Sequence, residues 1–312
     1  MEAFRLGRKL VADPNLLDLK NIVAEPEVLM AYGGHEDYNS ILERKTRSLQ
    51  HAYWQWWKGP GMAQQYRKTV EDAVGKMGLD DETNKHLARR VYDLILWDGL
   101  SYAQKYLNRV EEVFKLDRSD RGYAATKAVI RNLHKVMAVK DEFFTAQLLT
   151  DDEKLERDKV RYNIDEDNGD RISYVHINEP EFYLFGRQIR FDLPKWLARN
   201  WFYNIGKRAG FTRKLLSRWG WHEKEQGFRD WYYNDVIQFY LQNASKDYDW
   251  ALRGLRVLND PYRPDEFIVT GFREFVYPKM ERARKQFEQI RTTTPGHGEL
   301  PVMPAIAARS QQ

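Results

Sequence analysis

The chain has 312 residues, of which 42% are hydrophobic, 14% aromatic and 31% charged, and its formal net charge is +4. It has no cysteine, which excludes disulfides, thiolate nucleophiles and cysteine-bound zinc or iron–sulfur clusters in this chain. A mild positive excess spread along the chain gives little support to nucleic-acid binding. The length fits two domains or one extended helical domain, and the many aromatic residues fit a packed core or a partner surface.

The sequence shows no segment that would take the chain into or across a membrane. No window approaches the roughly 20 apolar residues that a membrane-spanning helix needs. The first ten residues, MEAFRLGRKL, lack the apolar run of a signal peptide. We therefore expect a cytoplasmic protein.

The first half of the chain reads as a series of helices. Residues 1–35 form short pieces broken by proline and glycine pairs, and we expect them to be an N-terminal docking segment. From Glu36 the apolar residues recur with helical spacing, and Gly59-Pro60-Gly61 is expected to separate one helix from the next, at about Met62–Met77. We expect residues 36–163 to be a helical domain.

The longest helical pattern follows after Asp80, which can cap it. Leu87, Val91, Leu94 and Ile95 form an apolar stripe, and Asp98-Gly99 is expected to kink the helix before it resumes to Leu116. Further helices are expected at about Ser119–Ala138, Lys140–Leu149 and Asp151–Tyr162.

A weak internal repeat lies within these helices. AQQYRKTVEDAV, residues Ala63–Val74, matches AQKYLNRVEEVF, residues Ala103–Phe114, at an offset of 40 residues. The match has two explanations that the sequence leaves open. One is the chance similarity of two amphipathic helices, and the other is a duplicated helix pair of the kind that stacked helical arrays use.

The residue pattern changes from helical spacing to alternation after the helical domain. Residues 164–193 contain a turn signal at Asn168-Gly169 and alternating segments rich in β-formers. We therefore predict a mainly α fold, a multi-helix domain with a small antiparallel β-hairpin or sheet inserted around residues 171–193. A second helical layer is expected over residues 194–291, with a flexible tail over residues 292–312.

The usual catalytic and ligand-binding motifs are missing. There is no phosphate-binding glycine loop and no nucleophile elbow, and the seven histidines do not stand at metal-ligand spacing. An acidic run from Asp151 to Asp158 is explained by helix capping. We assign no catalytic, cofactor-binding or metal residue to this chain.

Asp141, His134 and His176 are the residues from which a self-sufficient active site could be built. His134 and Asp141 share one face if their helix is continuous, but seven residues of helix rise about 10.5 Å, too far for a hydrogen bond. A catalytic pair within that helix is therefore excluded, and an Asp141 paired with Lys or Arg elsewhere is favoured.

A basic aromatic stretch lies at residues 194–229, where nine Lys or Arg stand against two Glu with four Trp interleaved. This pattern suits single-stranded nucleic acid, because bases stack on aromatic rings. It equally suits a helical layer with long basic side chains on its surface, or a docking face for an acidic subunit.

Four segments carry a resemblance to a known family. They are ARRVYDLILWDGLSYAQKYLNRVEEVF, AVIRNLHKVMAVKDEFFTAQLL, FRDWYYNDVIQFY and TGFREFVYPKMERARKQFE. In this order they resemble the helical C-terminal domain of bacterial indolepyruvate:ferredoxin oxidoreductases, members of the 2-oxoacid:ferredoxin oxidoreductase superfamily. The opening EAFRLGRKLVADP looks like the end of the preceding domain of those enzymes. The resemblance extends to about Arg291.

The resemblance implies a place in a larger enzyme. Such enzymes use thiamine diphosphate and Mg to decarboxylate a 2-oxoacid, and iron–sulfur clusters pass the electrons to ferredoxin. This chain has no cysteine for a cluster, and its only Gly-Asp, Gly169-Asp170, is followed by Arg171 rather than by the cofactor motif. We therefore expect a separately encoded, non-catalytic helical subunit of an indolepyruvate-type complex, with these cofactors in partner subunits.

Three hypotheses remain. The first is the accessory subunit, which would dock on its partners through exposed aromatic and basic residues; the candidates are Trp54, Trp56, Trp57, Arg213, Trp219 and Trp221. The second is a helical protein that binds nucleic acid through residues 194–229. The third is a complete enzyme whose site includes Asp141, His134 or His176.

Overall fold

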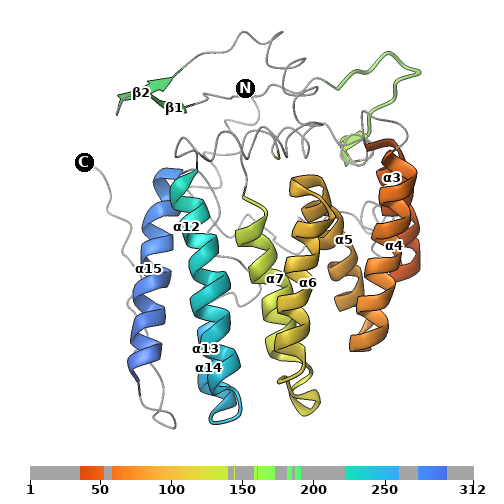
Figure 1. The fold of residues 1–312 in the computed structure, drawn as a ribbon. Helices are drawn as coiled ribbons and strands as arrows, with labels where there is room; N and C mark the ends of the chain where they lie inside the picture. Colours follow the sequence, from red (N-terminus) through yellow and green to blue (C-terminus); the bar gives the residue numbers. More distant parts are fainter. Residues whose placement is uncertain are drawn as a thin grey trace, which may run out of the picture.

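The structure is a computed structural model. It describes residues 36–52, 58–139, 144, 158–159, 161–172, 181–184, 187–190, 222–259 and 273–293. Within this part of the chain the fold is mainly α-helical, so the predicted fold class is confirmed at that level. The helices are α3 (Tyr38–Ala52), α4 (Lys58–Met77), α5 (Asp81–Asp98), α6 (Leu100–Phe114), α7 (Ala124–Met137), α12 (Glu223–Trp231), α13 (Ile237–Asn243), α14 (Tyr248–Leu255) and α15 (Arg273–Thr292) (Figure 1).

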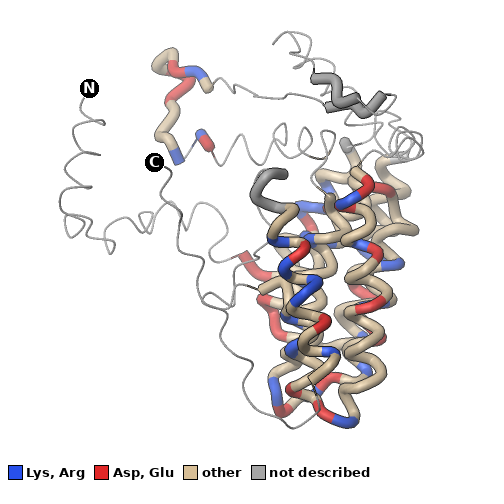
Figure 2. Tube along the Cα trace, turned by 90° about the vertical axis from the view of Figure 1, so that its left-hand side faces the viewer, with Lys and Arg blue, Asp and Glu red and all other residues tan. Residues whose placement is uncertain are grey.

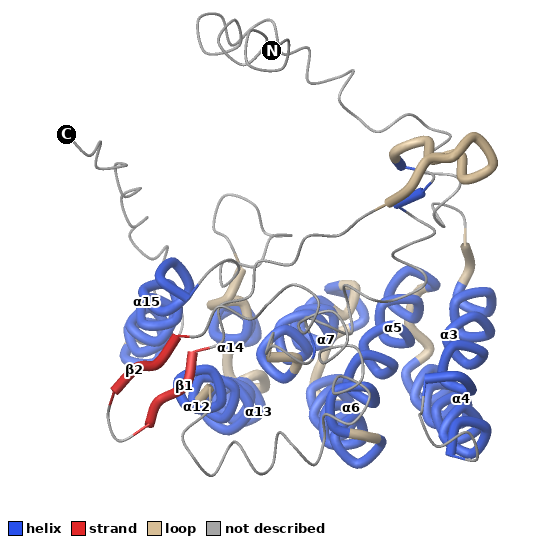
Figure 3. Tube along the Cα trace, turned by 90° about the horizontal axis from the view of Figure 1, so that it is seen from above, coloured by secondary structure: helices blue, strands red, loops and turns tan. Residues whose placement is uncertain are grey.

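The helices stand in two rows. Seen from above, α3, α5, α7 and α14 form one row, which we call layer A, and α4, α6 and α12–α13 form the other, layer B (Figure 3). Successive helices alternate between the layers, and each packs on its neighbours in both. α15 closes one end, where it packs on α14 and bonds to α12 through Arg284 and Tyr277.

Gly99 makes the alternation possible between α5 and α6. Its φ of 85° lies in the region that glycine adopts without strain, and the chain reverses there. The predicted kink at Asp98-Gly99 is therefore wrong: the segment forms two antiparallel helices rather than one bent helix. Periodicity alone could not distinguish them, because the apolar stripe has the same spacing on either side of the turn.

Gly59-Pro60-Gly61 does not separate two helices as predicted, because α4 already begins at Lys58 and the three residues form its first turn. Proline, which has no backbone N–H, is tolerated there, because an N–H in the first turn would have no acceptor within the helix. A Cβ on Gly59 would sit 2.0 Å from the carbonyl oxygen of Gln50 in α3. This glycine therefore lets the start of α4 approach the backbone of α3.

Aspartates fix the starts of the layer A helices at one end of the array. Asp37, Asp80 and Asp247 each accept a hydrogen bond from the backbone N–H three residues later, as N-caps of α3, α5 and α14. The N–H of Tyr38 also donates to Asp81 at 3.0 Å, which joins the starts of α3 and α5. The layer A helices therefore run parallel to one another, and the layer B helices run the opposite way.

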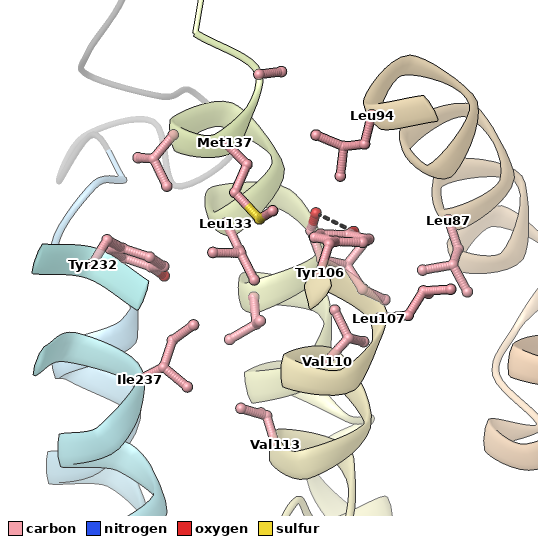
Figure 4. Close-up of a cluster of buried hydrophobic side chains, with 14 of the residues drawn as sticks. Leu87, Leu94, Tyr106, Leu107, Val110, Val113, Leu133, Met137, Tyr232 and Ile237 are labelled. Atoms are coloured by element: carbon pink, nitrogen blue, oxygen red, sulfur yellow. Dashed lines mark hydrogen bonds between the residues drawn. The ribbon is translucent and has the colours of Figure 1, made fainter. Parts of the chain in front are cut away.

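A tyrosine repeats through the core. The hydroxyl of Tyr66 in α4 donates to the carbonyl of Ala88 in α5, and Tyr106 in α6 donates in the same way to Ile130 in α7 (Figure 4). Tyr232, after α12, makes a third such bond to Leu255 in α14. All three rings are fully buried.

Three equivalent bonds explain the weak sequence repeat. Each links a layer B helix to the next helix of layer A, and Ala63, Tyr66 and Val70 are buried as their counterparts Ala103, Tyr106 and Val110 are. The similarity at an offset of 40 residues thus marks structurally equivalent positions. The array is built from repeated helix pairs.

Two short strands are also present. β1 (Glu181–Leu184) and β2 (Arg187–Arg190) pair antiparallel, with Glu181 opposite Arg190 and Leu184 opposite Arg187. Each of these strands packs mainly against the other, and neither packs extensively on a described helix. A hairpin or sheet inserted at residues 171–193 and packed on the helices is therefore not supported, and it stays a prediction.

Helices from both predicted helical stretches meet in one array. α7 packs on α12 and α14, and α6 packs on α13. The boundaries proposed at residues 163 and 193 stay predictions, and residues 1–35 and 294–312 lie outside the described residues. None of the helices that the structure describes is long and apolar enough to cross a membrane.

Candidate functional site

A groove of about 690 Å³ opens at the end of the array where α5 and α7 finish. Four helices contribute to it: the ends of α5 and α7, the start of α6, and α12 with the turn that follows it. The described residues that line it are Trp97, Asp98, Tyr102, Lys105, Met137, Gln226, Arg229, Asp230, Tyr233 and Asn234.

An aromatic wall forms one side of the groove. Trp97 and Tyr102 stack with their ring centroids 4.8 Å apart. The indole N–H of Trp97 donates to the carbonyl of Val139, and the hydroxyl of Tyr102 donates to that of Met137. Burial raises the pKa of Tyr102, so this hydroxyl stays protonated and acts as a donor. Both rings are thereby held at the end of α7, which makes the wall rigid.

The charged side chains of the groove differ in whether they form hydrogen bonds or ion pairs. The Arg229 Nε donates to Asp230 at 2.8 Å; burial alone would lower the pKa of Arg229, but Asp230 and Tyr102 raise it. Lys105 is exposed and makes no hydrogen bond or ion pair with the described residues. It can therefore meet an acidic group of a ligand.

A π-helical turn shapes the opposite side. Residues Tyr232–Val236 form this turn between α12 and α13, and it carries Tyr233 and Asn234. The extra residue in such a turn changes the direction of the side chains, and π-turns are frequent at functional sites. Arg109 of α6 lies 4.5 Å from the centroid of the Tyr233 ring and supports it from behind.

This arrangement is suited to binding. The described lining contains no histidine, and its carboxylates do not form a pair: Asp230 is bound to Arg229. An aromatic wall, two amides and the exposed ammonium of Lys105 can hold an apolar side chain and a carboxylate together. No group of three or more possible metal ligands occurs within the described ranges.

His134, one of the residues considered for catalysis, lies beside Asp93 of α5. The Nε2 of His134 lies 3.2 Å from the Oδ2 of Asp93. The alignment is poor, and neither ring nitrogen forms a hydrogen bond within the described part of the chain. Burial lowers the pKa of His134, and Asp93 opposes this only in part. The pair links α5 to α7, while Asp141 and His176 lie outside the described residues.

This buried histidine predicts a pH-dependent stability. The pKa of His134 is below 6.5 in the folded state, so the unfolded chain binds the proton more readily. We expect the free energy of unfolding to fall as pH drops below about 6.5 and to level off beneath the folded pKa. Denaturant titrations across this range measure the slope.

A variant isolates the contribution of this group. His134→Gln should make the free energy of unfolding depend less steeply on pH. Adding His86→Gln should reduce this dependence further, because burial and the adjacent Arg90 also lower the pKa of His86. The pKa of His134 also depends on the charges of Asp93, Arg90 and Lys135. The pKa of His86 depends on those of Arg90, Glu82, Arg89 and Arg131. An unchanged slope in His134→Gln would contradict the assignment.

The candidate docking residues from the sequence lie outside the described residues; they are Trp54, Trp56, Trp57, Arg213, Trp219 and Trp221. They stay predictions. Sequence reasoning missed the groove, because its lining comes from helices far apart in the chain. Local signals were present in two of the family segments: ARRVYDLILWDGLSYAQKYLNRVEEVF contains Trp97, Asp98, Tyr102 and Lys105, and FRDWYYNDVIQFY contains Arg229, Asp230, Tyr233 and Asn234.

Residues 83–217 match a family of unknown function, DUF6537. The match begins inside α5 and includes α6, α7 and the first two of the four segments that carry the resemblance given above. Neither a search of curated proteins nor a search of solved structures found a match. The matching family leaves the activity open.

Proposed function

We propose that this chain is a non-catalytic helical subunit of a thiamine-diphosphate-dependent 2-oxoacid:ferredoxin oxidoreductase of the indolepyruvate type. The observation that supports the proposal is the resemblance of the four helical segments given above, and the groove offers a place where a partner could bind. Thiamine diphosphate, Mg and iron–sulfur clusters would be held by partner subunits, in a cytoplasmic hetero-oligomer that reduces ferredoxin. The segment around residues 171–193 would be a hairpin inserted between the helices.

The groove would receive a segment of a catalytic partner. An apolar or aromatic side chain would rest on Trp97 and Tyr102, and a neighbouring carboxylate would meet Lys105. Aromatic anchors in pockets contribute much of the binding energy of protein interfaces. The rigid wall would lose little conformational entropy on binding.

Purification of the tagged full-length chain from its native cells tests the proposal. We expect it to co-elute with subunits that contain thiamine diphosphate and iron–sulfur clusters, detected by cofactor analysis and mass spectrometry. The complex should reduce ferredoxin when a 2-oxoacid is added. Elution of the chain as a monomer, with no thiamine-diphosphate-dependent partner, would overturn it.

A charge reversal at the groove sharpens this experiment. Lys105→Glu should weaken co-elution with the partner, because it replaces the exposed ammonium by a carboxylate. Lys68→Glu makes the same change on the exposed surface of α4 and should leave co-elution unaltered. Equal effects of the two substitutions would exclude the groove as the docking site.

Nucleic-acid binding through residues 194–229 remains the alternative. Most of this stretch lies outside the described residues. Its two described cations are engaged, because Lys224 lies 4.7 Å from the ring centroid of Tyr277 and Arg229 bonds to Asp230. Binding to single strands that falls steeply with salt would favour this alternative over the subunit.

A further inference from the structure

The π-helical turn at Tyr232–Val236 contains one residue more than a regular helix would need. The backbone N–H of Ile237 bonds to the carbonyl of Tyr232, five residues earlier, which is the spacing of a π-helix. The segments before and after this turn, α12 and α13, are α-helical. The irregularity is therefore confined to a single turn between two regular helices.

The packing of α12 and α13 would be satisfied with one residue fewer. Phe228 of α12 and both Ile237 and Tyr240 of α13 are buried. Each residue of a regular helix turns by about 100°, so the 12 positions from Phe228 to Tyr240 would place these side chains about 120° apart, and Ile237 would lie opposite Phe228. With one residue removed, the two angles fall to about 20° for Tyr240 and about 80° for Ile237. A shorter regular helix could therefore bury all three side chains on one face.

The equivalent helices of the array pack without an extra residue. Tyr66 and Tyr106 make the same hydrogen bond as Tyr232, and each lies inside an uninterrupted helix, α4 or α6. The packing of a layer B helix on layer A therefore does not require a π-helical turn. The turn after Tyr232 needs another explanation, and such turns are frequent at functional sites.

The extra residue brings Tyr233 and Asn234 to the groove. Tyr233 is half-buried over Arg109, whereas Asn234 is exposed. A side-chain amide carries both a donor and an acceptor, so it can pair with a backbone peptide group. The same groove contains the ring of Trp97 and the exposed ammonium of Lys105. A segment that offers a peptide group, an aromatic ring and a carboxylate would therefore match it.

We propose that the extra residue is a recognition element, which turns Tyr233 and Asn234 into the groove to bind an extended segment of a partner protein. An extended segment suits Asn234, because its backbone N–H and C=O groups are unpaired, whereas those of a helix are bonded within the helix. Uncharged groups can provide the selectivity, since acidic and basic residues are interspersed along the described helices (Figure 2). The inference rests on the proposed function in taking the ligand to be a protein segment.

A pair of deletions tests whether the extra residue belongs to the packing. Asn234 and Asn108 are both exposed, and each is the second residue after an equivalent tyrosine, Tyr232 or Tyr106. Deletion of Asn234 should make the turn a regular helix and leave the denaturation midpoint of the full-length chain unchanged or higher. Deletion of Asn108 should abolish the cooperative transition, because it rotates the rest of α6 by about 100° and takes its buried face out of the core.

A capped dipeptide tests recognition without any partner subunit. The probe is N-acetyl-phenylalanyl-glutamate N-methylamide, which is too short to form a helix and carries a ring, a carboxylate and peptide groups. We expect saturable chemical-shift changes in NMR titrations of the full-length chain. Asn234→Ala should bind about 3- to 10-fold more weakly, the range for one lost hydrogen bond. Deletion of Asn234 should weaken binding further, because Tyr233 also turns away, and Asn108→Ala should bind as the unmodified chain does.

Three results would overturn the inference. They are a deletion of Asn234 that destabilises the chain as much as the deletion of Asn108, no binding of the dipeptide by the unmodified chain, and equal affinity of the unmodified chain and both Asn234 variants. Failure of the proposed function is a separate result. A chain that binds the dipeptide through Asn234 but co-elutes with no partner would refute the proposed function alone.

Discussion

Replacement of Tyr106 by alanine is expected to lower the free energy of unfolding by about 3–5 kcal/mol. Its ring is fully buried between α6 and α7 and packs in the centre of the array (Figure 4). The substitution removes this contact area, leaves a cavity and abolishes the 2.8 Å bond from the hydroxyl to Ile130. Chemical denaturation measured by circular dichroism gives the change.

Tyrosine-to-phenylalanine substitutions separate the bond from the packing. Tyr106→Phe should cost about 1 kcal/mol, because only the hydroxyl is lost. Tyr66→Phe and Tyr232→Phe should cost similar amounts, since each removes an equivalent bond. Tyr162 is 64% exposed, and Tyr162→Phe serves as the neutral control. If the three substitutions lower the free energy of unfolding by different amounts, the three bonds are equivalent in position but not in their contribution to stability.

Gly254 is expected to tolerate no larger side chain. A Cβ at this position would lie 2.9 Å from the ring of Phe239, which packs edge-on against Trp250 and Phe287. Gly254→Val should therefore lower the free energy of unfolding by about 3 kcal/mol through overpacking. Gly254→Ala should lower it by about 1 kcal/mol, because the gain in helix propensity offsets part of the clash.

Gly75 is the matched control for this substitution. It lies in α4, is exposed, and has no atom within 4 Å of a built Cβ. Gly75→Ala should raise the free energy of unfolding by about 0.5–1 kcal/mol, as helix propensity predicts. Thermal and chemical unfolding of both alanine variants would show opposite signs; the same sign at both positions would contradict the packing described for Gly254.

The sequence predicted much of the helical content because local periodicity carries it. Leu87, Val91, Leu94 and Ile95 were expected to form one apolar stripe, and all four are buried. The capping role of Asp80 was also expected, and its side chain accepts from the backbone N–H of Thr83. These features depend on residues within a few turns of one another.

The arrangement of the helices was beyond local patterns. Whether the chain bends or reverses at Gly99 depends on the tertiary contacts of α5 and α6, which the spacing of apolar residues does not encode. The third member of the tyrosine series, Tyr232, was missed because the π-helical turn breaks the register after α12. The groove was missed for a similar reason, since Trp97 and Tyr233 meet only after the layers have formed.

The neighbours α7 and α12 are far apart along the chain, because α7 ends at Met137 and α12 begins at Glu223. During synthesis, α3 to α7 emerge first and contain local pairings that form quickly. The face of α7 that later packs on α12 and α14, including Leu133 and Met137, is therefore exposed until the rest of the chain has been synthesised. We expect this half-built array to be the species most prone to aggregation and to capture by chaperones.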